Sequence, residues 1–504
     1  AVRDVVVRHE TLRTIFREAN GVGEQIVLDP AAVELTFERI DASQETLAQS
    51  ARAFSEYRFD LTRDIPLRAA LFRSAPRRHT LVLLVQHIAS DGWSWAPLIE
   101  DLGVAYAARR QGEAPHQAPL PVQYADYSLW QQEWMAQESD PDSDIARQLA
   151  FWKDNLVGLP EQIGLATDRP RPARTVHAGD SVEIDFGPKV LRDLRELASQ
   201  HRCSLFMVLH ALVAALLTKL GGGTDLPIGT SVAGRHDEAL NNLVGFFVNL
   251  LVLRTDTSGD PSFHQLLDRV RETDLAIYSH QEVPFERLVN MVNPLRQSSQ
   301  HPLFQVAMVL QNNRDASVSM PDLAVRTEFL PLGTAKYDLT FEFVEQSDPD
   351  GSARGLSCNI EYMVDLYDRV TVDGFAEKLA RLIKTVTKRP DLPLSRVDLL
   401  GEEERDRLLN KWNGTARSMP SVTLPDLFAA QAARHPDAVV ASDGERTLNY
   451  GELDRRANRL AHYLQGLGVG PDVLVGLCME RSLDLLVAML AILILPLSML
   501  TWPA

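Results

Sequence analysis

Cysteine is scarce in this sequence. Only three cysteines occur among 504 residues, and Cys203, Cys358 and Cys478 lie far apart. Their spacing matches neither the short pairs that bind zinc nor the framework of a disulfide-rich secreted domain. Such usage is typical of proteins in a reducing compartment. We therefore expect a cytoplasmic protein with no disulfide scaffold and no metal site.

An excess of basic charge is also absent. The chain has 51 lysines and arginines against 68 aspartates and glutamates, so its formal net charge is −17. Nucleic acids require a basic surface to neutralise their phosphates, so we expect no nucleic-acid partner. The hydrophobic content of 45% and charged content of 24% are ordinary for a folded globular protein. A chain of this length predicts two to four domains.

Charged residues are missing altogether from the last 20 residues, "LLVAMLAILILPLSMLTWPA" (485–504). By length alone this segment is a candidate membrane span. However, a proline interrupts it, it continues an amphipathic helix that starts at "MERSLD", and no basic cluster flanks it. The first residues, "AVRDVVVRHETLRTIF", carry charges at helical spacing, unlike a signal peptide. We expect no contact with a membrane.

Apolar periodicity and turn signals divide the chain into two similar halves and a smaller third unit. We predict helical periodicity at 3–19, strands at 25–28 and 79–87, and helices at 94–110 and 143–156. After the extended, Pro- and Arg-rich segment 166–180, we predict helices at 188–200 and 204–219 and strands at 226–232 and 245–254. The third unit has helices at 425–434 and 450–467 around a hairpin with an Asp-Gly turn.

The stretch "LVLLVQHIASDGWSW" (81–95) carries the clearest chemical signal. An apolar strand ends in Gln86-His87, and Asp91-Gly92 follows as a turn. The unperturbed pKa of histidine, about 6.5, suits a general base near neutral pH. No "GxSxG" elbow or matched Cys-His pattern accompanies it, so a covalent acyl-enzyme is not indicated. On this spacing alone, a single histidine at a strand end favours a structural role.

Several motifs together resemble the condensation domains of nonribosomal peptide synthetases, in the chloramphenicol-acetyltransferase-like superfamily. "QHIASDG" is similar to the HHxxxDG motif of that family. Further segments resemble its motifs in the same order: "RHETLRTIF" (8–16), "YADYSLW" (124–130), "VGFFVNLLVLR" (244–254), "HQEVPFE" (280–286) and "RQSSQHPLFQ" (296–305). They cover residues 1 to about 395. "LNYGEL" (448–453) then resembles the first core motif of an adenylation domain.

The resemblance implies an α/β fold of two chloramphenicol-acetyltransferase-like lobes, with mixed sheets covered by helices, that form a pseudo-dimer around a central channel. The expected boundaries are 1–165 for the first lobe, 166–395 for the second and 396–424 for a linker. Residues 425–504 are expected to be the small, incomplete α/β start of an adenylation domain.

The same resemblance implies peptide bond formation. A donor aminoacyl or peptidyl thioester would be transferred to an acceptor aminoacyl thioester, each tethered to the phosphopantetheine of a carrier protein. The expected partners are therefore an upstream donor carrier, a downstream acceptor carrier and the adjoining adenylation domain. No cofactor is expected to bind the chain directly.

The resemblance also assigns roles to residues. His87 matches the catalytic histidine, and Asp91 would pair with an arginine, for which Arg68 is the matching position. Supporting roles fall to Gln86, Asp91, Gly92 and Arg68, and channel positions to Trp93, Ser94 and Asn249. Gly92 would allow a loop conformation closed to other residues.

Three departures from the family pattern stand out. Gln86 replaces the first motif histidine, and its amide can still support the loop by hydrogen bonds. A strand, a helix and a motif that precede "RHETLRTIF" in the family are missing, so we expect an N-terminally truncated first lobe with an exposed neighbouring strand. The adenylation segment lacks the expected Lys-Ala-Gly turn and its phosphate loop, so we expect no amino-acid activation.

Two alternatives remain. An epimerisation-type relative would share the histidine motif, although the adenylation start favours condensation. A catalytically impaired or non-catalytic docking module would keep the fold, and Gln86 and the ragged ends favour it. If the protein is a condensation domain, the residues of its motif segments slightly favour a donor of D configuration.

Overall fold

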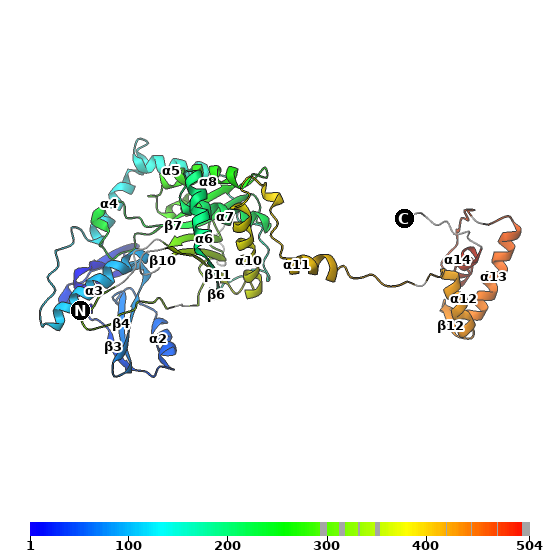
Figure 1. Ribbon diagram of the computed structural model, residues 1–504, viewed down its shortest axis with the longest axis horizontal. Helices are drawn as coiled ribbons and strands as arrows, with labels where there is room; N and C mark the ends of the chain where they lie inside the picture. The colour runs from blue at the N-terminus through cyan, green and yellow to red at the C-terminus, as the bar shows by residue number, and fades with distance from the viewer. Residues whose placement is uncertain are drawn as a thin grey trace. The chain divides into compact units, whose positions relative to one another are not determined.

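The computed structural model describes residues 1–292, 300–311, 318–330, 333–347, 353–419, 421–444, 446–470 and 472–495. These residues form two compact units, Ala1–Leu400 and Gly401–Ala504. Each unit is a mixture of helices and strands, and Figure 1 labels many of these elements, which are numbered in chain order.

The first part of unit 1 contains two small sheets. Its strands are β1 (Thr14–Ala19), β2 (Val22–Val27), β3 (Phe37–Asp41), β4 (Leu67–Ala75) and β5 (Arg78–Val85). Its helices are α1 (Val2–Arg8), α2 (Leu47–Ser55), α3 (Trp95–Arg110) and α4 (Tyr124–Met135). β1 and β2 form an antiparallel hairpin, whereas β4 pairs with β3 in parallel and with β5 in antiparallel fashion. In the described residues β5 is therefore an edge strand of the three-stranded sheet.

The helix predicted over residues 3–19 is wrong beyond Arg8. The chain becomes extended at His9, whose φ and ψ angles are −103° and 106°. The His9 imidazole is 1% exposed and lies 2.8 Å from Asp101 Oδ2 on α3. Thr14 and Ile15, both β-branched, then begin β1 opposite β2. Tertiary contacts thus outweigh the helical spacing of the sequence.

The second part of unit 1 is built on one six-stranded mixed sheet in the order β6-β11-β10-β9-β7-β8. Its strands are β6 (Gly179–Phe186), β7 (Asp225–Val232), β8 (Asn249–Asp256), β9 (Val306–Gln311), β10 (Leu339–Ser347) and β11 (Ala353–Met363). β9 runs parallel to β10 and β7, and the other pairs are antiparallel.

Helices cover this sheet. They are α5 (Asp144–Asn155), α6 (Pro188–Gln200), α7 (Leu205–Lys219), α8 (Phe263–Tyr278), α9 (Phe285–Val292) and α10 (Arg369–Val386). α7 is apolar around its whole circumference, and every residue from Met207 to Leu217 is buried, as expected for a helix enclosed on all sides. α5 joins this core through Trp152, which is fully buried and donates to the His280 carbonyl at 2.7 Å. The predicted lobe boundary at residue 165 stays a prediction, although α5 precedes it and packs with the second sheet.

Unit 2 is small. It contains α11 (Glu402–Asp406), α12 (Leu424–Arg434), β12 (Val439–Ser442), β13 (Thr447–Asn449), α13 (Tyr450–Gly466) and α14 (Leu483–Ile494). The predicted hairpin is confirmed: β12 pairs with β13, and Gly444 in its turn has a φ of +93°. Of the apolar segment 485–504, residues 496–504 lie outside the described part of the chain. Among described residues, no single helix is both long and apolar enough to cross a membrane.

Candidate active site

The loop that follows β5 begins with Gln86. The strand ends at Val85, two residues earlier than predicted, so strand alternation does not extend to His87. Gln86 instead caps a short 3₁₀ helix, η3 (His87–Ala89), because its side-chain oxygen accepts from the Ile88 amide at 2.5 Å. The amide of Gln86 therefore fixes the first turn of the loop that carries His87.

One ring nitrogen of His87 forms a hydrogen bond, and the other has no partner in the part of the chain that the structure describes. Its Nδ1 lies 2.7 Å from the Ser90 carbonyl oxygen, and because a carbonyl can only accept, Nδ1 must be the donor. In the neutral ring Nε2 is then the acceptor, and it has no hydrogen-bond partner among the described residues. The side chain is exposed, and the ring of Phe246 packs edge-to-face against it, with 5.1 Å between centroids.

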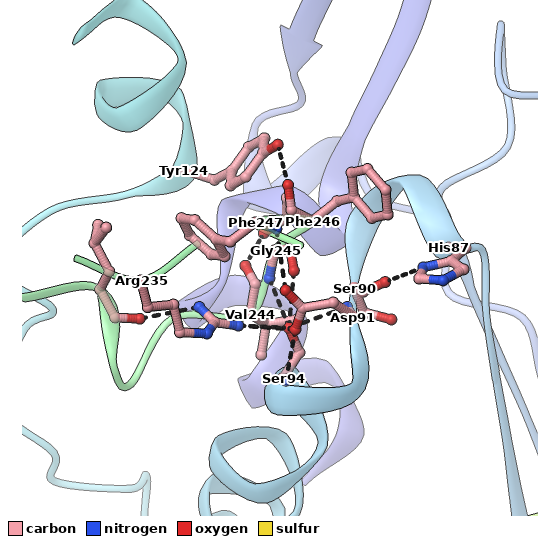
Figure 2. A network of polar contacts seen from close by, with 12 residues as sticks. His87, Ser90, Asp91, Ser94, Tyr124, Arg235, Val244, Gly245, Phe246 and Phe247 are labelled. Atoms are coloured by element: carbon pink, nitrogen blue, oxygen red, sulfur yellow. Dashed lines mark hydrogen bonds and ion pairs between the residues drawn. The ribbon is translucent and has the colours of Figure 1, made fainter. Parts of the chain in front are cut away.

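Asp91 is the centre of a buried polar network behind this imidazole (Figure 2). Its Oδ1 accepts from the backbone and hydroxyl of Ser94 at 2.9 and 2.8 Å and from Arg235 at 2.9 Å. Its Oδ2 accepts from the Phe247 amide at 3.0 Å. Since Asp91 is 2% exposed, these donors compensate its loss of hydration. His87 and Arg235 lie at opposite ends of the network.

The predicted pair of Asp91 with Arg68 is wrong. Arg68 lies on β4 and bonds Glu38 on the neighbouring β3 at 2.7 Å, with its guanidinium stacked 3.7 Å from the centre of the Tyr57 ring. The partner of Asp91 is Arg235, on the loop that joins β7 to β8 of the six-stranded sheet. Burial lowers the pKa of the Arg235 guanidinium, against the opposing effect of Asp91.

Sequence reasoning missed Arg235 as a functional residue. Its signal was nevertheless present, because the residue comes three positions after the apolar strand β7, in "SVAGRHDE". A strand end places a side chain at the rim of a sheet, as it does for His87 at the end of β5.

The prediction that Ser94 lines a channel is also wrong. Its side chain is 0% exposed, and its hydroxyl lies 2.9 Å from the carbonyl oxygen and 3.1 Å from the amide of Gly245. Gly92 begins the 3₁₀ turn η4 (Gly92–Ser94) without a positive φ angle, so the turn depends on the Asp91 cap and not on glycine's conformational freedom. Trp93 is partly exposed on the same turn.

Asn249 begins β8 and holds a second loop in place. Its Nδ2 donates to the carbonyls of Gln281 and Val283 at 2.8 and 2.7 Å, and its Oδ1 accepts from the Phe285 amide at 3.0 Å. The side chain thus joins β8 to the "HQEVPFE" segment. Asn249 also lines a cavity of about 130 Å³, so its predicted channel position stays open to test.

Tyr124 on α4 completes the site. Its hydroxyl donates to the Phe246 carbonyl at 2.7 Å, and its ring packs against Phe247 with centroids 5.0 Å apart. Burial raises the pKa of this phenol above its usual range, so it remains a donor at all relevant pH values. The hydroxyl therefore fixes the backbone of the residue that contacts His87 (Figure 2). The sequence predicted no role for Tyr124 beyond its place in the motif "YADYSLW".

Comparison with known proteins identifies the family. The model of the condensation domain matches residues 1–409, and that of the AMP-binding enzyme matches residues 428–497. The chain belongs to the condensation domain family. The resemblance drawn from the motifs is thereby confirmed, although residues 296–299 of the last motif lie outside the described residues.

Curated relatives are much longer than this chain. A dimodular nonribosomal peptide synthase of Bacillus subtilis is 47% identical over 497 residues, which are 98% of this chain and 21% of the relative. An isonitrile lipopeptide synthase of Mycobacterium tuberculosis is 42% identical over 98% of this chain and 20% of its own length. The condensation domain chain therefore spans about a fifth of these two relatives.

Solved structures agree with the fold. The X-domain from teicoplanin biosynthesis is 33% identical, with a TM-score of 0.75 over 79% of this chain and 88% of its own. A four-domain nonribosomal peptide synthetase bound to AMP and glycine has a TM-score of 0.82 over 97% of this chain and 37% of its own, at 24% identity. The predicted class of mixed sheets covered by helices, in a chloramphenicol-acetyltransferase-like arrangement, is confirmed.

Proposed function

We propose that this condensation domain forms a peptide bond between a donor aminoacyl or peptidyl thioester and an acceptor aminoacyl thioester, each held on the phosphopantetheine of a carrier protein. One observation carries the proposal. Ser90 pins His87 Nδ1 as a donor, and this leaves Nε2 as an exposed acceptor beside the junction of the two sheets.

The chemistry requires such an acceptor. The α-amine of the acceptor has a pKa of about 8 and is neutral when it attacks the thioester carbon. As the C–N bond forms, the attacking nitrogen must lose a proton, and His87 Nε2 can take it. Collapse of the tetrahedral intermediate breaks the C–S bond, and the leaving pantetheine sulfur takes a proton, which restores the neutral imidazole. Holding the two thioesters in line adds the benefit of proximity.

Asp91 and Arg235 act through the loop in this proposal. They are positioning residues, because the buried pair joins the His87 loop to the β7–β8 connection and touches no reacting atom. Gln86 contributes the cap of η3. This assignment leaves His87 as the single side chain with a proton-accepting role.

A second candidate function is docking without chemistry. The X-domain from teicoplanin biosynthesis, which shares the fold, has also been solved in complex with the protein OxyB. A chain of this family can therefore serve as a recruitment surface, and Gln86 in place of the first motif histidine is compatible with that role.

A single-turnover assay separates the two candidates. The full chain would be mixed with one carrier bearing a donor aminoacyl group and another bearing an acceptor, and intact-protein mass spectrometry would follow the dipeptidyl product on the acceptor carrier. We expect product with the native chain and a loss of about 10²–10⁴-fold in rate for His87→Ala. His79→Ala, at an exposed histidine on the strand β5 that precedes the His87 loop, is the matched control and should keep the native rate.

Absence of transfer by a chain that still binds both carriers would support docking and reject condensation. Equal rates for His87→Ala and the native chain would reject the role of His87 while leaving the reaction itself in place.

A further inference from the structure

A cavity of about 130 Å³ lies beside the candidate active site. Its walls come from α4, the 246–249 loop that leads into β8, and the 281–286 segment that Asn249 holds in place. Six aromatic residues contribute to the lining: Tyr124, Tyr127, Trp130, Trp134, Phe246 and Phe247. Trp130 is 49% exposed and stacks on Trp134, with ring centroids 6.4 Å apart, so the outer rim opens toward solvent.

Phe246 connects the cavity to His87. Its ring packs 5.1 Å from the imidazole centroid, and the same residue lines the cavity. The Tyr124 hydroxyl fixes its backbone at 2.7 Å. A group bound in the cavity thus lies next to the residue whose ring packs against the imidazole.

The charge of the cavity is negative. Glu282 and Glu286 line it together with the imidazole of His236, and no lysine or arginine is among its lining residues. Neither carboxylate forms an ion pair with an arginine or lysine within the described residues. The Glu282 carboxylate accepts only an amide hydrogen bond, from Gln148 at 2.9 Å, and its charge helps to raise the pKa of Tyr127 after burial.

Two cations lie near the cavity without lining it. Arg235 stacks 4.2 Å from the centre of the Phe247 ring, but its guanidinium is paired with Asp91 at 2.9 Å. Lys336 does not line the cavity, and burial lowers its pKa against the smaller opposing effect of Glu286. Glu282 is therefore the carboxylate that most directly sets the potential among the rings.

We propose that this cavity binds a positively charged side chain, an ammonium or guanidinium group, of the aminoacyl group that reacts at His87. The inference rests on the proposed function and adds a substrate class to it. Aromatic faces attract cations, the apolar stem of a lysine or ornithine side chain packs on rings, and a carboxylate completes the site. A neutral side chain of the same length gains only the apolar part of this interaction.

The single-turnover assay tests the proposal with matched substrates. Lysine and norleucine have stems of the same length and differ by the terminal ammonium group. Each would be placed in turn on the donor carrier and on the acceptor carrier, opposite an alanyl partner. We expect one arm to show at least about a fivefold preference for lysine. The preference should fall to about one in Glu282→Gln and persist in Glu133→Gln, an exposed glutamate on α4 outside the cavity.

Equal rates for lysine and norleucine in both arms would overturn the cavity proposal and leave condensation intact. If no donor group is transferred to any acceptor, the proposed function fails. The cavity proposal is then tested by the binding of the loaded carriers to the chain, measured by calorimetry. Tighter binding of the lysyl carrier that is lost in Glu282→Gln would support the cavity, and equal binding would reject it.

Discussion

Two imidazoles in unit 1 show opposite uses of the same side chain. His87 follows β5, is exposed, and has one ring nitrogen bonded to Ser90. His210 lies within α7 and is 0% exposed, with Nδ1 3.0 and 3.1 Å from the Asp274 carboxylate oxygens and Nε2 2.8 Å from Thr255 Oγ1. His87 therefore has one ring nitrogen without a hydrogen-bond partner in the described residues and is exposed. Both ring nitrogens of His210 have partners, and its side chain is buried.

The contrast shows why hydrogen-bond pattern alone does not identify a reactive histidine. The Asp274–His210–Thr255 chain has the order of a nucleophile relay, yet all three side chains are buried and no substrate can reach them. A free nitrogen in an accessible place is the distinguishing feature, and in this pair only His87 has it. His210 is therefore a stabilising element of the helix-covered sheet.

The largest expected effect on stability comes from replacing the buried His210. His210→Phe removes the partner of Asp274 in a fully buried position, so we expect the free energy of unfolding to fall by about 3–5 kcal/mol. Urea unfolding of the full chain, followed by tryptophan fluorescence, measures it. His87→Ala should change stability by less than about 0.5 kcal/mol, since an exposed side chain is lost. Similar losses for both variants would erase the distinction between the two imidazoles.

The anchor of the His87 loop gives the next effect. Arg235→Met leaves Asp91 with the Ser94 and Phe247 donors but without its cation, and we expect a loss of about 2–3 kcal/mol in stability. Arg68→Met is the matched control and should lose less than about 1 kcal/mol, because its partner Glu38 is 41% exposed. A larger loss of stability for Arg68→Met than for Arg235→Met would favour the Asp91–Arg68 pair predicted from the sequence.

A third histidine sharpens the comparison through pH. Burial lowers the pKa of His301 to about 4, with a further contribution from Lys336. Below pH 6.5 the unfolded chain takes up the proton first, so the stability that His301 contributes is complete above pH 6.5 and is lost as pH falls toward 4. We expect about 2 kcal/mol of this loss at pH 5. It should disappear in His301→Phe, measured by urea unfolding at pH 5.0 and 7.5; an unchanged pH dependence would contradict the assignment.

The smallest effect tests the surroundings of the exposed histidine. Tyr124→Phe keeps the ring and removes the hydrogen bond to the Phe246 carbonyl. We expect a rate lower by about 2- to 10-fold, equivalent to 0.5–1.5 kcal/mol, because Phe246 then holds the His87 ring less firmly. Single-turnover rates with saturating carriers measure it. Tyr127→Phe is the control, since its phenol has no bond to that carbonyl, and an equal loss there would point to packing alone.

The sequence predicted the elements whose signals are local. The helices 94–110, 188–200 and 204–219 were placed to within a residue or so, because their apolar spacing coincides with their packing. The strand predicted from residue 245 begins only at Asn249. Of the four residues before it, Gly245 contacts Ser94 and Phe247 contacts Asp91, which the apolar run did not reveal.

For the site, the division is similar. His87 and the Gln86 cap could be predicted because both depend on neighbours within a few residues. The partner of Asp91 could not, since Arg235 is 144 residues away and is brought near only where the β7–β8 loop meets the loop that follows β5. Ser94 was misjudged for the same reason, because its burial depends on Gly245.

The Asp91 network has a mechanical consequence. It is buried, charged and made of bonds from the β5–α3 loop to the β7–β8 loop, so pulling the two sheets apart at this point would strand an unpaired carboxylate. A rearrangement of these two loops that keeps the bonds must leave Asp91 and Arg235 in contact. His87 lies four residues before Asp91 on the same loop, so the network that joins the two loops also anchors the imidazole.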